Sequence, residues 1–223
     1  MRPSDLAGLF DHTNLRSDTT ELQIRTLCAE ARTYRFAAVC VNPVWVTLAC
    51  DLLADTDISV AATAGFPLGA TKTEIKVAEC LASVDDGANE IDLVANIGWL
   101  ASDRFVEAES EIRKVRRNLP SNVILKVIIE CNLLDPGRWP DAAKAVANAG
   151  AEFVKTGTGF AGPVTDEQVR LLHAAVGDRI KLKAAGGIRT LSQARLLIDS
   201  GASRLGCSST VSIIQEASRP PEP

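Results

Sequence analysis

The chain has 223 residues, 46% of them hydrophobic and only 4% aromatic, and a formal net charge of −4 at pH 7. Its apolar content is too high for a disordered chain, and its negative charge excludes the broad basic surface that binds nucleic acid. No stretch approaches the roughly 18 consecutive apolar residues of a membrane span, and charged residues come too early for a signal peptide. We therefore expect a cytoplasmic protein that binds neither nucleic acid nor membranes.

Six cysteines are scattered along the chain without a Cys-x-x-Cys pair, and two histidines accompany them. Structural zinc sites need such close ligand pairs, so we expect reduced thiols, no metal and no cofactor. His12 is a single imidazole in a predicted strand, and we interpret it as a hydrogen-bonded barrel residue rather than a catalytic one. His173 falls in a predicted outer helix, where we expect it to face solvent.

Short runs rich in Val, Ile and Ala alternate with longer amphipathic stretches along the whole chain. The runs predict eight strands, at 9–13, 37–41, 58–63, 90–94, 123–130, 152–155, 180–184 and 204–206. A 3.6-residue apolar period predicts helices near 19–34, 43–54, 71–86, 101–118, 136–149, 165–176, 190–200 and 209–217. Eight such units of about 28 residues favour an α/β fold that closes into a single-domain (β/α)8 TIM barrel over residues 1–217. The proline-rich segment 218–223 is expected to be a flexible tail.

The alternation of side chains along the predicted strands sends charged residues into the barrel. This inward set comprises Glu90, Asp92, Lys126, Glu130, Lys155, Lys181 and Lys183. An isolated buried charge costs several kcal/mol, so such residues form internal ion pairs or have a function. Active sites of these barrels lie at the carboxyl ends of the strands, where Lys155, Lys183 and Asp92 are expected. Glu90 and Lys181 lie lower and are predicted to form a structural ion pair.

Two lysines at one barrel mouth change each other's acidity. At about 6 Å and an effective dielectric constant of about 20, one ammonium raises the charging cost of the other by roughly 3 kcal/mol, or about 2 pKa units. Partial desolvation acts in the same direction, and a lysine that is neutral near pH 7 is a nucleophile for carbonyls. The pattern therefore favours a metal-free, amine-dependent aldolase. It does not decide between Lys155 and Lys183 as the nucleophile.

Three glycine-bearing loops, at 156–159, 185–189 and 206–209, follow the last three predicted strands. Late loops and a helix amino terminus commonly hold phosphate in this fold through their backbone N–H groups. One such loop is weak evidence, because glycines also serve ordinary turns. Three in consecutive units predict a phosphate site.

Several motifs together resemble the deoxyribose-phosphate aldolase family in order and spacing, over residues 4 to about 215. They are Asp11-His12-Thr13, Cys40-Val41-Asn42-Pro43, Gly65-Phe66-Pro67-Leu68-Gly69, Glu90-Ile91-Asp92, Leu125-Lys126-Val127-Ile128-Ile129-Glu130, Val154-Lys155-Thr156, Lys183-Ala184-Ala185-Gly186-Gly187-Ile188-Arg189 and Gly206-Cys207-Ser208-Ser209. The resemblance implies reversible cleavage of 2-deoxy-D-ribose 5-phosphate to D-glyceraldehyde 3-phosphate and acetaldehyde.

The resemblance also implies a role for individual residues. Lys155 would form the Schiff base, Lys183 would perturb its pKa, and Asp92 would relay protons through water. The implied substrate site has Asp11 and Thr13 on the hydroxyls, Cys40 lining the pocket, and a phosphate cradle made of Gly159, Gly186, Gly187, Gly206, Ser208 and Ser209.

Several positions depart from the family pattern, and two of them concern the substrate: Gly157 stands where serine is general, and Phe160 stands where some members have a lysine near the phosphate. They keep open a second function, a Schiff-base aldolase with a different aldehyde acceptor. A third, a noncatalytic phosphosugar-binding barrel, is disfavoured because Lys155, Lys183 and Asp92 are all present. Phosphosugars and aldehydes are the expected partners, and a homodimer is a candidate assembly.

Overall fold

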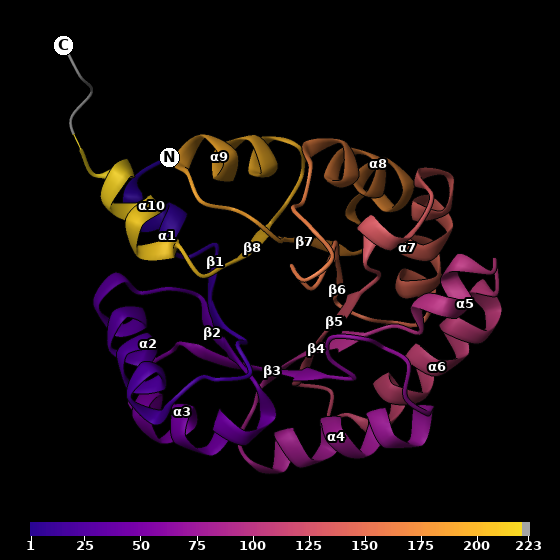
Figure 1. Cartoon of the computed structure of the whole chain (residues 1–223), viewed down its shortest axis with the longest axis horizontal. Coiled ribbons are helices and arrows are strands. Elements are labelled where there is room, and N and C mark those ends of the chain that lie inside the picture. The colour runs from indigo at the N-terminus through magenta and orange to yellow at the C-terminus, as the bar shows by residue number, and fades with distance from the viewer. Residues whose placement is uncertain (220–223) are drawn as a thin grey trace.

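The computed structural model, which describes residues 1–219, is a closed barrel of parallel strands surrounded by helices (Figure 1). The strands are β1 (Phe10–Asn14), β2 (Ala38–Val41), β3 (Ser59–Ala64), β4 (Glu90–Val94), β5 (Ile124–Ile128), β6 (Phe153–Lys155), β7 (Lys181–Ala185) and β8 (Arg204–Cys207). Each strand pairs with the next in the chain, and β8 closes the ring by pairing with β1. The predicted (β/α)8 TIM barrel is confirmed.

The helices form the outer layer. They are α1 (Pro3–Ala7), α2 (Glu21–Tyr34), α3 (Val46–Leu53), α4 (Thr73–Asp85), α5 (Ile97–Ala101), α6 (Phe105–Asn118), α7 (Trp139–Asn148), α8 (Asp166–Val176), α9 (Leu191–Asp199) and α10 (Thr210–Ala217). Short 3-10 helices lie at η1 (Pro43–Trp45), η2 (Cys131–Leu133), η3 (Pro136–Arg138) and η4 (Gly177–Arg179). The short helix α1, which the sequence pattern did not predict, packs against α10 (Figure 1). No helix in the described part of the chain is long and apolar enough to cross a membrane.

Threonine and glutamine side chains fix where three of the outer helices begin. Thr20, Thr165 and Thr190 each precede a helix and form a capping box with the glutamine three residues later. The paired side chains satisfy backbone N–H groups that the first helical turn leaves free. These caps set the starts of α2, α8 and α9, each of which follows a loop at the carboxyl end of a strand.

Two predicted elements differ from the observed ones for backbone reasons. The helix predicted at 101–118 is interrupted, because Asp103 has a positive φ of 58° and separates α5 from α6. The strand predicted at 123–130 stops at Ile128, because Glu130 has a φ of 52° and directs the chain into η2. The tail predicted at 218–223 lies outside the described residues from position 220 onward.

Aliphatic side chains fill the layer between strands and helices, whereas the barrel interior is charged. Val39, Ile91, Leu93 and Val127 are fully buried against the helices, as expected for parallel strands covered on their outer face. The ladder register sets the charged residues side by side on the inner face: Asp92 pairs with Lys126, and Lys155 pairs with Lys183. The barrel therefore concentrates charge at its centre.

Candidate active site

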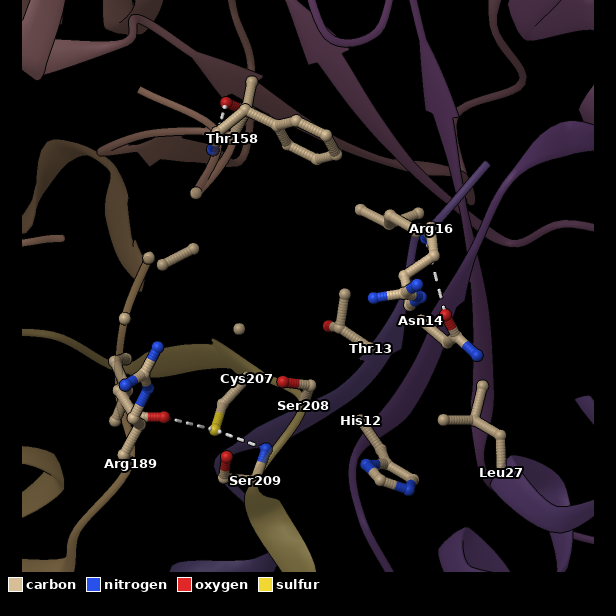
Figure 2. A pocket seen from close by; sticks show the side chains of 18 of the residues that line it. His12, Thr13, Asn14, Arg16, Leu27, Thr158, Arg189, Cys207, Ser208 and Ser209 are labelled. Carbon is tan, nitrogen blue, oxygen red and sulfur yellow. Dashed lines mark hydrogen bonds between the residues drawn. The ribbon is translucent and has the colours of Figure 1, made fainter. Parts of the chain in front are cut away.

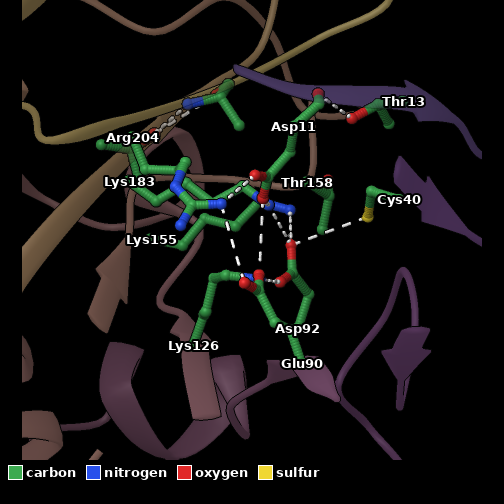
Figure 3. Close-up of polar contacts among 12 residues, drawn as sticks. Asp11, Thr13, Cys40, Glu90, Asp92, Lys126, Lys155, Thr158, Lys183 and Arg204 are labelled. Carbon is green, nitrogen blue, oxygen red and sulfur yellow. Dashed lines mark hydrogen bonds and ion pairs between the residues drawn. The ribbon is translucent and has the colours of Figure 1, made fainter. Parts of the chain in front are cut away.

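Six buried charged side chains and the partly buried Arg204 form one connected group inside the barrel, which we call the barrel network (Figure 3). It contains three carboxylates and four basic groups: Asp11, Glu90, Asp92, Lys126, Lys155, Lys183 and Arg204. Such a cluster is stable only when its charges are paired and hydrogen-bonded. The strands supply these partners directly, because residues from neighbouring strands face one another across the narrow interior.

Asp92 lies at the centre of the network and is fully buried. Its Oδ1 accepts from Lys126 Nζ at 2.8 Å, while its Oδ2 accepts from Lys155 Nζ at 2.7 Å and from Lys183 Nζ at 2.6 Å. The Cys40 thiol lies 3.8 Å from the same Oδ2. A single carboxylate thus holds three ammonium groups, and two of them share one oxygen.

The other two carboxylates connect the lower part of the network. Asp11 accepts from Lys183 through Oδ2 and from Arg204 Nη1 through Oδ1, the latter at 2.7 Å. Glu90 pairs with Lys126. The predicted pair between Glu90 and Lys181 is therefore wrong: Lys181 is exposed at the start of β7 and lies over the Phe153 ring at 5.6 Å.

The pKa values of the four basic groups are shifted in different directions. Burial disfavours the charged form of each of them. In Lys126, Lys183 and Arg204 the neighbouring carboxylates outweigh burial and raise the pKa. In Lys155 burial prevails and the cation of Lys183 adds to it, so the pKa is lowered despite Asp92. Lys155 is therefore the basic group of the network that most readily becomes a neutral amine.

A pocket of about 590 Å³ opens at the carboxyl end of the strands, within the usual size range for small-molecule sites. Among the seven described side chains of the barrel network, Lys155 alone lines it. Its side chain is 3% exposed, whereas Lys126 and Lys183 are completely buried beneath. The one lysine with a lowered pKa is thus also the one that a bound molecule can reach.

The rim of the pocket is made by the late loops and by β1 (Figure 2). Gly159, Gly186, Gly187, Gly206, Ser208 and Ser209, the six residues of the predicted phosphate cradle, all line the pocket. Helix α10 begins directly after Ser209, so its free N–H groups come close to this rim. The guanidinium groups of Arg16 and Arg189 lie on opposite sides of the same opening (Figure 2).

Two cradle glycines are required by their surroundings. Gly186 has a φ of 119°, and a Cβ there would lie 2.8 Å from the carbonyl oxygen of Gly162. Gly187 has a φ of 68°, and a Cβ there would lie 2.8 Å from the Pro163 side chain. Positive φ and contact with the neighbouring loop both exclude larger residues. The loop after β7 can therefore lie close to the loop after β6 and keep its backbone open to the pocket.

The remaining predicted site residues lie at different depths. Thr13 lines the pocket, and its hydroxyl donates to the Asp11 carbonyl at 2.8 Å. The predictions that Asp11 contacts substrate hydroxyls and that Cys40 lines the pocket stay predictions, since both side chains are fully buried in this structure and neither lines the pocket. The physical reason is that Asp11 is held between Lys183 and Arg204, while Cys40 faces Asp92 under Lys155.

A family model described as DeoC/LacD family aldolase matches residues 6–214. A protein named deoxyribose-phosphate aldolase from Desulfitobacterium hafniense is 46% identical over 216 residues, which cover 96% of this chain and 99% of the relative. The chain belongs to the DeoC/LacD aldolase family. A solved structure named QR15, an aldolase, covers 95% of this family member and 95% of its own chain, with a TM-score of 0.91 and 37% identity. The structure of deoxyribose phosphate aldolase from Aeropyrum pernix, described as a unique tetramer, covers 96% of this chain and 91% of its own, with a TM-score of 0.86 and 29% identity.

Sequence reasoning missed several residues that the aldolase barrel brings to the site. The sequence pattern predicts that Lys126 points inward but indicates no role for it. Arg204 has the same parity as Gly206 on β8, so alternation places it inward as well. His12 is buried as expected, with Nε2 2.8 Å from Glu30 and Nδ1 bonded to Thr210 at 2.5 Å. This contact joins β1 to the first residue of α10, and the sequence contains no local signal for it.

Glu130 is a further buried residue whose role the pattern did not reveal. Its carboxylate accepts from the backbone N–H and the hydroxyl of Thr158, a pocket residue on the loop after β6. A Cβ on Gly157 would come within 2.7 Å of Glu130 Oε1. The glycine that departs from the family pattern therefore gives this carboxylate room to hold the loop.

Proposed function

We propose that the protein is a class I aldolase that reversibly cleaves 2-deoxy-D-ribose 5-phosphate to D-glyceraldehyde 3-phosphate and acetaldehyde. One observation carries the proposal: Lys155 is buried, has a lowered pKa, and is the network lysine at the pocket. A neutral amine facing a small-molecule pocket is the group that Schiff-base catalysis requires. The substrate follows from the relatives named deoxyribose-phosphate aldolase, which match this chain over almost its full length.

The chemistry balances with the protein's own groups. Lys155 Nζ adds to the aldehyde carbon of the open-chain sugar phosphate, and loss of one water gives a protonated Schiff base. Removal of the proton from the C3 hydroxyl breaks the C2–C3 bond, and the bonding electrons pass into an enamine. Glyceraldehyde 3-phosphate leaves, the enamine carbon is protonated, and water releases acetaldehyde and the free amine.

Lys183 and Asp92 act on Lys155 from below in this proposal. Lys183 keeps its proton because Asp11 and Asp92 both accept from it, so it presents a permanent cation to Lys155. Asp92 compensates that cation and orients the side-chain nitrogens of both lysines. Burial favours the neutral acid of Asp92, but the three lysines outweigh it and hold its pKa well below the ordinary value. Direct proton donation from Asp92 at pH 7 is therefore excluded, and a water polarised by Asp92 and a lysine is the proposed proton carrier.

The substrate phosphate is proposed to lie at the rim formed by Gly186, Gly187, Ser208 and Ser209. Backbone N–H groups of open glycine loops and of a helix start are ordinary phosphate donors. The guanidinium of Arg189 lies beside this rim and adds positive charge. With the phosphate there and the aldehyde at Lys155, the sugar would span the pocket.

Phe160 supports the alternative function, a Schiff-base aldolase that uses a different aldehyde acceptor. Its ring is 64% exposed, lines the pocket, and contacts Phe66 edge-to-face with centroids 5.5 Å apart. An apolar ring at this rim offers no charge to a phosphate and suits a less polar aldehyde.

A cytoplasmic location and a homodimer remain predictions from the sequence.

Incubation of the purified protein with 2-deoxy-D-ribose 5-phosphate tests the proposal. Acetaldehyde and glyceraldehyde 3-phosphate should form in equal amounts, and Lys155→Leu should reduce turnover at least about 100-fold because the nucleophile is lost. Lys181→Leu is the matched control, since Lys181 is an exposed lysine outside the barrel network, and it should retain turnover. Absence of both products with the natural chain would refute the proposed reaction, and full turnover by Lys155→Leu would refute the proposed nucleophile.

A further inference from the structure

Arg204 belongs to the barrel network but lies below the pocket. It is the first residue of β8, at the end of the barrel opposite the pocket rim, and its side chain is 16% exposed. It donates to Asp11 Oδ1 at 2.7 Å, lies 3.7 Å from Glu90 Oε1, and stacks over Phe153 at 5.8 Å. It does not line the pocket, so any effect on the reaction must pass through other residues.

The charge count of the barrel network depends on Arg204. Asp11, Glu90 and Asp92 supply three negative charges, and three lysines would balance them completely. Arg204 is a fourth basic group, and guanidinium does not lose its proton in proteins. With Arg204 present, full protonation of every lysine would therefore leave one uncompensated positive charge in a buried cluster, which is costly.

The contacts decide which lysine gives up its proton. Lys126 lies within 4 Å of all three carboxylates, and Lys183 contacts Asp11 and Asp92. Lys155 contacts Asp92 only, and through an oxygen that it shares with Lys183. The excess charge is least compensated at Lys155, which also has the pocket next to it.

Other groups facing this cluster do not change the count. From β2, the Cys40 thiol is held neutral near pH 7, because burial raises its pKa to about 11. From β3, Thr63 is buried and carries no charge. From β7, Lys181 is exposed to solvent, where water screens its charge.

We propose that Arg204 is a positioning residue that keeps Lys155 in its neutral, nucleophilic form by occupying Asp11 and Glu90. Those carboxylates would otherwise compensate the three lysines fully. The proposal rests on the proposed function only for its consequence in catalysis, since the protonation state of Lys155 is a property of the free protein. The proposal also gives a reason for the guanidinium of Arg204, since a charge inside a packed barrel is otherwise unfavourable.

The direct test is the pKa of Lys155, measured without substrate by NMR titration of lysine side chains labelled with ¹³C at the ε position. Lys155→Met identifies the signal. In Arg204→Gln the pKa of Lys155 should rise by about one unit, the order of magnitude expected when a unit charge is removed from the same network at an effective dielectric constant of about 20. Arg204→Lys keeps the charge and should leave the pKa of Lys155 within a few tenths of a unit of its natural value.

Charge rescue separates this role from a merely structural one. Glu90→Gln alone removes one carboxylate and should lower the pKa of Lys155. Glu90→Gln combined with Arg204→Gln restores the excess of one cation and should return it toward the natural value. An unchanged pKa in either folded single variant, or a double variant that behaves like Arg204→Gln, would overturn the proposal.

Catalysis supplies a second, separable readout. In Arg204→Gln the alkaline rise of turnover should move up by about one pH unit, which means roughly tenfold slower turnover on the acid side of that rise. The NMR result stands even if the protein cleaves another substrate. Failure of the proposed function is thus seen as missing turnover in the natural chain, whereas failure of this inference is seen as an unmoved pKa.

Discussion

Lys155 and Lys183 donate to the same oxygen of Asp92, at 2.7 and 2.6 Å, yet only Lys155 lines the pocket. The ladder between β6 and β7 sets the two residues directly side by side. Lys183 has a second carboxylate, Asp11, and keeps its proton, whereas Lys155 has none. A difference of one contact therefore divides two neighbouring lysines into a permanent cation and a candidate nucleophile.

Removal of that permanent cation should make Lys155 more basic. In Lys183→Met we expect the pKa of Lys155 to rise and the alkaline rise of turnover to move upward by about one to two pH units, because a neighbouring positive charge is lost. Asp11 would still have its ion pair with Arg204, and Asp92 would still have its ion pair with Lys126, so the variant should fold. The pH profile of turnover is the measurement, and Lys181→Met is the matched control. An unchanged profile with full activity would show that the two lysines are not coupled.

Asp92→Asn should affect both stability and turnover. The sequence pattern suggested a choice between a proton-relay role and a structural role, but Asp92 compensates three buried ammonium groups. Loss of a buried ionic partner costs about 3 to 5 kcal/mol, so we expect a lower melting temperature at pH 7. The folded fraction should still trap a Schiff base but cleave at least about 100-fold more slowly. Near-normal turnover per folded molecule would eliminate Asp92 from proton transfer.

The same carboxylate predicts how stability depends on pH. The three lysines outweigh burial and lower the folded-state pKa of Asp92 below that of the unfolded chain. Its contribution to stability is thus present above about pH 4 and is lost as the pH falls toward the folded-state pKa. Denaturant unfolding between pH 6 and 3 should show a smaller loss of stability in Asp92→Asn than in the natural chain. Equal losses in the two proteins would contradict this assignment.

Phe160→Lys should change preference for the phosphate. A lysine at this exposed rim position adds a positive charge next to the proposed cradle, and we expect kcat/KM for deoxyribose 5-phosphate to rise several-fold relative to that for deoxyribose. Val106→Lys adds the same charge on α6, at a residue that is 80% exposed and does not line the pocket, and should leave the ratio unchanged. A ratio unaffected by Phe160→Lys would place the phosphate elsewhere.

The fold was predictable because each unit carries its own signals. Apolar runs mark the strands, the stretches with a 3.6-residue period mark the helices, and eight such units leave room for little else than a closed barrel. The boundaries that failed lie where a non-glycine residue has a positive φ. Asp103 and Glu130 both have this uncommon conformation, and no local apolar or glycine pattern marks it in the sequence.

The site was only partly predictable for a related reason. Strand alternation placed Asp92, Lys155 and Lys183 inside the barrel, but it does not give height, and height decides which lysine reaches the pocket. Parity also misassigned the partner of Glu90: Lys126 and Lys181 both have inward parity, but Lys126 lies on β5, which pairs with the strand of Glu90, whereas Lys181 lies on β7. The contacts of Arg204 with Asp11 and of Thr210 with His12 join residues near opposite ends of the chain, and no local sequence pattern indicates such contacts.

Lys155, and not the neighbouring Lys183, is the proposed nucleophile. Treating the protein with acetaldehyde and sodium borohydride reduces any Schiff base to a stable ethylamine, and peptide mass spectrometry locates the added group. We expect ethylation of the peptide that contains Lys155, at a site absent from Lys155→Leu and unaffected by Lys181→Leu. Ethylation mainly at Lys183 in the natural chain, or no ethylated lysine at all, would contradict it.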